Sequence, residues 1–133
     1  MRFYIVFMLF ALTYGIAKAE WEPAMNNKDN TQITYVDPST IRKVGGTADM
    51  WSLTDLMIGS YIDGKRYSSQ KDHREYNCNT MKMRTIFASI HSENMGRGKE
   101  LDRITGNQQW EPIPHGTVAE ALKKIACGEI IIH

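Results

Sequence analysis

The sequence contains two cysteines, Cys78 and Cys127, and this pair constrains the fold more than any other feature of the chain. If the two sulfurs are joined, the middle of the chain and its C-terminal end must lie side by side. Disulfides persist in oxidising compartments and are rare in the cytosol. The compartment therefore decides how the pair is interpreted, and the N-terminal residues indicate which compartment it is.

Residues 1–19 have the three-part layout of a secretory signal peptide. Arg2 supplies a positive charge, and Phe3–Leu12 is an unbroken apolar run. Ala17 and Ala19 then give the small-x-small pattern that a signal peptidase needs. The apolar stretch is shorter than the roughly 20 residues of a membrane-spanning helix. We therefore predict cleavage after Ala19.

Cleavage leaves residues 20–133 as one exported domain, which we expect to be periplasmic, secreted or associated with the outer surface, without a transmembrane segment. No cysteine stands at the cleavage site, so we expect no lipid anchor there. The whole chain has 16 basic and 15 acidic residues and a net charge of +1. A protein that coats nucleic acid carries a basic excess, so nucleic acid is excluded as the expected partner.

Export favours a disulfide between Cys78 and Cys127, which in the chain-entropy model contributes about 4 kcal/mol. Two buried free thiols are the alternative. A metal site is disfavoured because neither cysteine lies in a C-x-x-C motif or close to a histidine.

Short alternating segments separated by Gly and Pro predict a mostly antiparallel β-sheet. The predicted strands cover residues 31–36, 40–44, 47–56, 66–76, 81–90, 99–104 and 108–113. Gly45–Gly46 and Asp63–Gly64 are typical of tight turns. Asp37–Pro38 is predicted to end the first strand in a turn. The very polar segment Arg66–Tyr76 is predicted to be an exposed edge strand.

Met81–Ile90 is the most apolar internal run and is predicted to be a core strand. In an unbroken strand, both faces of this segment would carry apolar side chains, which a sheet with one covered face does not need. Either a bulge near Thr85 shifts the register, or another subunit covers the second face. The sequence leaves both alternatives open.

The chain is predicted to end in one helix that begins at a capping box, in which Thr117 and Glu120 each satisfy a backbone amide. Val118, Leu122 and Ile125 follow at the spacing of an apolar helical stripe. The tail 130–132 is predicted to add a strand or to dock on the sheet.

Several motifs, each weak alone, occur in an order that resembles the surface-adhesin protein E-like family. The motifs are Trp21, Tyr35–Asp37, Thr40–Ile41, Met50–Leu53, Ser69–Lys71, Glu75–Cys78, Lys82–Arg84, Trp110–Thr117 and Cys127. The resemblance implies an α+β fold with an antiparallel sheet of about five to six strands. It implies that the C-terminal helix packs on one face and is tied to the sheet by the Cys78–Cys127 disulfide. The resemblance also implies that the protein forms dimers. It further implies that the protein is an adhesin that binds host extracellular-matrix or serum glycoproteins.

No catalytic, cofactor or metal motif is found: the sequence has no H-E-x-x-H, no G-x-S-x-G and no phosphate-binding glycine loop. A basic group is the better candidate site. Its members fall in two consecutive predicted strands and their turn: Lys82, Arg84, Arg97, Lys99 and Arg103. Paired as a hairpin, these residues would form a cationic patch for a sulfated glycan or an acidic protein. Ordinary surface charge, offset by neighbouring acidic residues, is the alternative.

The three tryptophans are Trp21, Trp51 and Trp110. Trp51 is expected in the core. Trp21 and Trp110 are expected to pack together in the core, with a groove lining as the alternative.

The sequence therefore predicts an exported, non-enzymatic binding domain of the adhesin E-like type with a protein or glycan partner. The alternative is a periplasmic inhibitor of a lysozyme or protease, which would insert the loop Met57–Lys65, with Tyr61 at its centre, or the tip Asn94–Gly98 into an active site. An envelope protein without an external ligand is a third interpretation.

Overall fold

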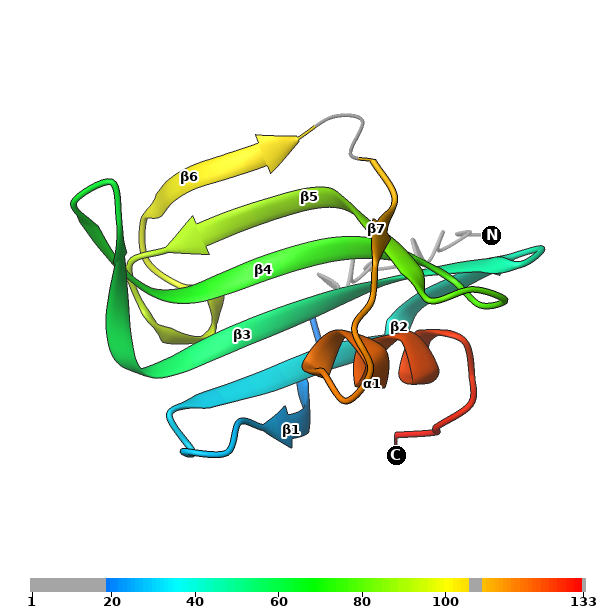
Figure 1. Ribbon diagram of the computed structural model, residues 1–133. Coiled ribbons are helices and arrows are strands. Elements are labelled where there is room, and N and C mark those ends of the chain that lie inside the picture. Colours follow the sequence, from blue (N-terminus) through cyan, green and yellow to red (C-terminus); the bar gives the residue numbers. More distant parts are fainter. Residues whose placement is uncertain (1–18, 106–108, 133) are drawn as a thin grey trace, which may run out of the picture.

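The computed structural model describes residues 19–105 and 109–132 and contains an antiparallel sheet with one α-helix packed against it (Figure 1). In this part of the chain the sheet has seven strands: β1 (Glu22–Asn26), β2 (Gln32–Val44), β3 (Thr47–Ile62), β4 (Lys65–Asn77), β5 (Lys82–His91), β6 (Glu100–Thr105) and β7 (Glu111–Pro112). A short 3₁₀ turn, η1 (Asn94–Gly96), precedes β6, and the helix α1 (Val118–Ala126) follows β7. The predicted fold class is confirmed. The predicted signal peptide, apart from Ala19, lies outside the described residues.

Strands β1 to β6 form a meander in which each strand pairs with the next one in sequence. The two-residue turns at Gly45–Gly46 and Asp63–Gly64 connect β2 to β3 and β3 to β4, as predicted. Asp63 and Gly64 have φ values of 48° and 76°, the left-handed conformation that such hairpin turns require. Strand β7 pairs with the start of β5, which has β4 on its other side, so β6 and β7 share one edge of β5.

The predicted turn at Asp37–Pro38 is wrong, because β2 continues through it as a bulge between Asp37 and Arg42. Local side-chain hydrogen bonds replace part of the ladder here. The Ser39 amide donates to the Asp37 carboxylate at 3.1 Å, and the Thr40 hydroxyl donates to the Asp37 carbonyl at 2.6 Å. The same hydroxyl accepts the Trp51 amide of β3 at 3.0 Å. A bulge therefore preserves the strand where the dipeptide predicts its end.

The prediction that Arg66–Tyr76 is an exposed edge strand is also wrong, because β4 lies between β3 and β5. Three of its polar residues, Ser68, Ser69 and Asp72, are buried, and Ser69 and Asp72 have hydrogen-bond partners within the protein. The Ser69 hydroxyl donates to the Glu93 carbonyl at 2.6 Å and accepts the Gly96 amide at 2.8 Å. Asp72 is 3 % exposed and accepts a hydrogen bond from Gln70 at 2.9 Å. Buried polar groups with partners look the same in sequence as solvated ones.

Strand β5 contains the bulge that the sequence left as one of two alternatives. Phe87 pairs with His73 and Thr85 pairs with Arg74, so Ile86 is the extra residue. A bulge moves the following side chains to the other face. The bulge accounts for the apolar residues at both odd and even positions of this strand without a second subunit.

The core lies between α1 and the strands β2, β3 and β4. Its members are Val36, Ala48, Met50, Tyr76, Ile113, Leu122, Ile125, Ala126 and Cys127. The predicted helix is confirmed, and its N-cap is Thr117, whose hydroxyl accepts the Glu120 amide at 3.3 Å. Leu122 and Ile125 are buried on the predicted stripe.

The disulfide between Cys78 and Cys127 is present, so the alternative of two free thiols is excluded. Cys78 follows β4 directly and Cys127 caps the C-terminal end of α1. The bond therefore fastens the helix to the sheet. The tail docks on the core through Ile132, while Ile131 is 73 % exposed. No helix in the described part of the chain has the length and apolar character that crossing a membrane requires.

Candidate functional site on the helix-free face of the sheet

The helix covers one face of the sheet, and the opposite face carries a row of side chains that crosses five strands. The pairs Asp37 with Trp51, Trp51 with His73, His73 with Phe87, and Phe87 with Thr105 are each directly opposite across neighbouring strands. Cross-strand partners project to the same side of a sheet. The helix-side core residues alternate with this row, since Met50 and Ser52 flank Trp51 in β3. We call this surface the helix-free face.

The centre of the row is aromatic. The Trp51 and His73 rings are stacked, with centroids 4.9 Å apart and planes 11° apart. The Phe87 ring is tilted relative to the Trp51 ring, and the two ring centroids are 5.5 Å apart. All three side chains are half-buried. The expectation that Trp51 belongs to the core is wrong, because the strand alternation that buries Met50 turns Trp51 to the other side. The result is a partly exposed aromatic surface.

Charged groups surround the aromatic row. The Asp49 carboxylate accepts hydrogen bonds from both His73 Nε2, at 2.8 Å, and Arg42 Nε, at 3.3 Å. On the other side, the guanidinium of Arg103 lies 5.8 Å from the centre of the Phe87 ring. Arginine over an aromatic face is a favourable cation–π arrangement. A cation therefore lies on each side of the aromatic centre of the row, Arg42 on the β2 side and Arg103 on the β6 side.

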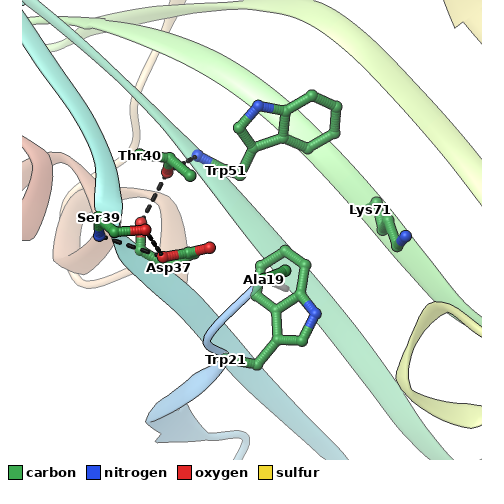
Figure 2. Close-up of a pocket in the computed structure, with 7 residues that line it drawn as sticks. All are labelled: Ala19, Trp21, Asp37, Ser39, Thr40, Trp51 and Lys71. Atoms are coloured by element: carbon green, nitrogen blue, oxygen red, sulfur yellow. Dashed lines mark hydrogen bonds between the residues drawn. The ribbon is translucent and has the colours of Figure 1, made fainter. Parts of the chain in front are cut away.

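A shallow hollow of about 350 Å³ lies beside the row, between Trp21 and Trp51. Figure 2 shows Trp21 and Trp51 among the residues that line the hollow, with Asp37 and Lys71 on either side. Ala19, Ser39 and Thr40 complete its lining. Asp37 is 2 % exposed and accepts the Ser39 hydroxyl at 2.5 Å. Trp21 lines this hollow, as the groove alternative predicted, whereas Trp110 lies beside Arg84, so the expectation that the two pack together is wrong.

The structure places the five predicted basic residues at separate positions. β5 and β6 do pair as the expected hairpin. Lys82 and Arg84 lie at the start of β5, whereas Arg97 and Lys99 lie beyond its end, so most of this ten-residue strand of about 30 Å lies between the two pairs. Arg103 lies between them, opposite Ser89.

Two of these five cations have both an acidic and an aromatic neighbour. Arg84 donates to Glu75 through two nitrogens, at 2.8 and 3.1 Å, and its guanidinium lies 4.8 Å from the centre of the Trp110 ring. Arg103 forms an ion pair with Glu100. The hydrogen bond from Arg103 lowers the pKa of the Glu100 carboxyl, and the same bond raises the pKa of Arg103. Both arginines are therefore held in place beside aromatic rings.

Sequence reasoning missed the aromatic row. Its members lie far apart in sequence, and only strand pairing brings them together. The register would have been needed to place Trp51 beside His73 and Phe87, and two bulges shift that register. The usable signal was the alternation Met50, Trp51, Ser52, which puts a tryptophan opposite a core methionine.

A serine–histidine pair at the edge of this face is not open to a substrate. The Ser89 hydroxyl and His91 Nε2 are 2.8 Å apart, but these residues are only 3 % and 8 % exposed. Burial, together with the nearby Lys71, lowers the pKa of His91. Across residues 19–105 and 109–132, no cluster of three or more His, Cys, Asp or Glu residues is suited to hold a metal ion.

The two segments expected to insert into an active site differ from each other. Met57–Lys65 is a continuation of the β3–β4 hairpin and not a loop, with Ile58 74 % exposed and Tyr61 67 % exposed. The tip Asn94–Gly98 is held against β3, because Asp55 accepts hydrogen bonds from the Asn94 side chain and the Met95 amide at 3.0 and 2.8 Å. The hairpin extends at one end of the sheet (Figure 1), and its Lys65 ammonium donates to the Leu101 carbonyl of β6 at 3.3 Å.

Comparison with known proteins gives consistent results. Three solved structures of Haemophilus influenzae protein E share the fold: crystal form II has a TM-score of 0.63 at 13 % identity, over 86 % of this chain and 91 % of that chain. Another structure of protein E has a TM-score of 0.60 at 14 % identity, over 86 % and 88 %. Protein E from non-typeable Haemophilus influenzae has a TM-score of 0.59 at 14 % identity, over 85 % of this chain and 78 % of that chain. A search of curated proteins finds no match.

The family model described as surface-adhesin protein E matches residues 21–128, which include every strand of the sheet, the helix and both cysteines. The chain therefore belongs to the surface-adhesin protein E family.

Proposed function

We propose that this protein is an exported, non-enzymatic binding domain that attaches to host extracellular-matrix or serum glycoproteins through its helix-free face. Family membership supports a surface-adhesin-like binding protein. The choice of surface rests on one observation, the half-buried aromatic side chains of Trp51, His73 and Phe87. Arg42 and Arg103 flank these side chains. Tryptophan and arginine are enriched among the residues that dominate binding energy at protein interfaces.

The predicted basic residues have a role at the edge of this surface. Arg84 and Arg103 hold their guanidinium groups against aromatic rings, so they lose little freedom when a partner binds. Lys82, Arg97 and Lys99 are exposed and accelerate the encounter with an acidic partner. Binding is therefore expected to weaken as salt is added.

The proposal is tested with the purified exported domain on a panel of immobilised extracellular-matrix and serum glycoproteins, with heparin as a sulfated glycan. For each ligand that binds, Trp51→Ala and Arg103→Ala are expected to weaken binding about tenfold or more, the loss typical of a central interface residue. Tyr61→Ala is the matched aromatic control, because Tyr61 is on the projecting hairpin, and it is expected to leave the affinity unchanged. Thermal melts show whether each variant is folded.

Absence of binding across the panel, or wild-type affinity for both Trp51→Ala and Arg103→Ala, would contradict the proposal. Cell fractionation tests the location, which we propose to be the periplasm or the outer surface. Light scattering after gel filtration tests the dimer that the family resemblance implies.

The exposed β3–β4 hairpin supports a second candidate, a periplasmic inhibitor. Met57, Ile58 and Tyr61 are 63–74 % exposed along the hairpin, which offers apolar side chains to an enzyme cleft. This function predicts stoichiometric loss of lysozyme or protease activity, abolished by Tyr61→Ala and unaffected by Trp51→Ala. If neither assay gives a signal, the third interpretation, an envelope protein without an external ligand, is favoured.

A further inference from the structure

Asp37 is a buried carboxylate at the edge of the hollow, and Lys71, which lines the same hollow, does not form an ion pair with it. Asp37 is 2 % exposed. One oxygen accepts the Ser39 amide and hydroxyl, at 3.1 and 2.5 Å. No Lys, Arg or His in the part of the chain that the structure describes forms an ion pair with it. A buried charge without a cationic partner is costly.

The other carboxylate oxygen of Asp37 accepts the backbone N–H of Glu20 at 3.2 Å. Glu20 is the residue that follows the predicted cleavage site. Its position is fixed from the C-terminal side, because Glu22 pairs with Val36, the neighbour of Asp37 on β2. We therefore expect the Glu20 nitrogen to stay beside Asp37 after cleavage.

Cleavage changes the chemistry of that nitrogen. A signal peptidase adds water across the Ala19–Glu20 amide: the C–N bond breaks, the hydroxyl goes to the Ala19 carbonyl carbon, and the Glu20 nitrogen takes up protons. The α-amino group so formed is largely protonated at neutral pH, since its ordinary pKa is about 7.7–8.0. A neutral amide donor is thus replaced by an ammonium ion at the same place.

We propose that removal of the leader completes the helix-free face: the new α-ammonium group of Glu20 forms the missing ion pair with Asp37, and Ala19 is taken out of the hollow between Trp21 and Trp51. Ala19 and Trp21 both form part of the wall of that hollow (Figure 2). The same cleavage therefore stabilises the start of β1 and enlarges the hollow. This inference rests on the predicted cleavage and not on the proposed adhesive function.

The test compares two purified forms of the exported domain, one that begins at Glu20 and one that begins at Ala19. The second form keeps the Glu20 N–H as a neutral donor and is the matched control. We expect the Glu20 form to melt about 5 °C higher, because an ion pair replaces a hydrogen bond from a neutral donor to the carboxylate in a small domain. We also expect its α-amino group to react several times more slowly with an amine-labelling reagent at neutral pH. Asp37→Asn should remove both differences.

The mass of protein recovered from the exporting cell should correspond to a chain that begins at Glu20. A different N-terminus would overturn the proposal. So would equal melting temperatures and labelling rates for the two forms, or differences that persist in Asp37→Asn. Because the two forms differ only in residue 19, the comparison remains decisive even if Asp37→Asn does not fold.

Discussion

At the scale of single residues, the core tolerates a polar atom that is not well paired. Tyr76 is fully buried at the centre of the helix-side core. Among the described residues its hydroxyl has no hydrogen-bond partner of good geometry, although the neighbouring Arg74 favours the ionised form. Burial dominates and raises the pKa of Tyr76 to about 12. The ring supplies the packing, and the hydroxyl carries a desolvation cost.

Replacing Tyr76 by Phe is therefore expected to raise the free energy of unfolding at pH 7 by about 1 kcal/mol, because an unpaired buried hydroxyl is removed. Above pH 10 the unfolded chain ionises this tyrosine while the folded chain does not. The wild type should thus lose about 1.4 kcal/mol for each pH unit between 10 and about 12, and Tyr76→Phe should not share this loss. Urea titrations at pH 7, 10 and 11 measure both effects.

Tyr61→Phe, at an exposed position, is the control and should behave as the wild type at each pH. A Tyr76→Phe protein that is less stable than wild type at pH 7 would mean that the hydroxyl is hydrogen-bonded.

At the scale of elements, the helix begins where its sequence says it should. Thr117 caps it, and Glu120 lies in its first turn, where its side chain accepts a hydrogen bond from His115 at 3.1 Å. Burial raises the pKa of the Glu120 carboxyl, but His115, Lys124 and the Gly116 amide outweigh burial and lower it. The capping box is thus altered: the carboxylate reaches the residues just before the cap.

Thr117→Ala is expected to lower the free energy of unfolding by about 1 kcal/mol, because the hydroxyl that accepts the Glu120 amide is lost. Thr117→Ser keeps that acceptor and should retain most of the stability. Chemical denaturation of the three proteins measures the difference. Equal stability of the Ala and Ser variants would show that the cap contributes nothing here.

At the scale of the whole molecule, one covalent bond holds two layers together. The disulfide joins positions 49 residues apart and connects the end of β4 to the end of α1. Without it, a nine-residue helix would depend on one apolar stripe for its attachment. Short helices are marginal without tertiary packing.

Reduction, or the double substitution Cys78→Ala and Cys127→Ala, is expected to destabilise the domain by about 4 kcal/mol, the loop-closure value for a loop of this length. Denaturation with and without reductant measures this loss. The double variant should show no response to reductant, which is its internal control. A loss below about 1 kcal/mol would mean that packing alone holds the helix.

The sequence by itself determined the features that depend on neighbouring residues. The glycine-containing turns, the helix with its threonine cap and the pairing of the only two cysteines each follow from local conformational preference or from the number of available partners. A mostly antiparallel sheet and one C-terminal helix follow from the same patterns, because alternation and helical spacing are local properties, whereas the packing of the helix on the sheet was implied only by the family resemblance.

Only the tertiary structure decided what depends on register and burial. Asp37–Pro38 reads as a turn, yet β2 passes through it, since Thr40 supplies a ladder partner to Trp51. The polar segment of β4 reads as an edge, yet it is central, since long-range partners satisfy its side chains. The aromatic row and the hollow exist because strands far apart in sequence are aligned, and two bulges set that alignment. Hydrogen bonding between distant strands is a property of the folded chain, and no local pattern encodes it.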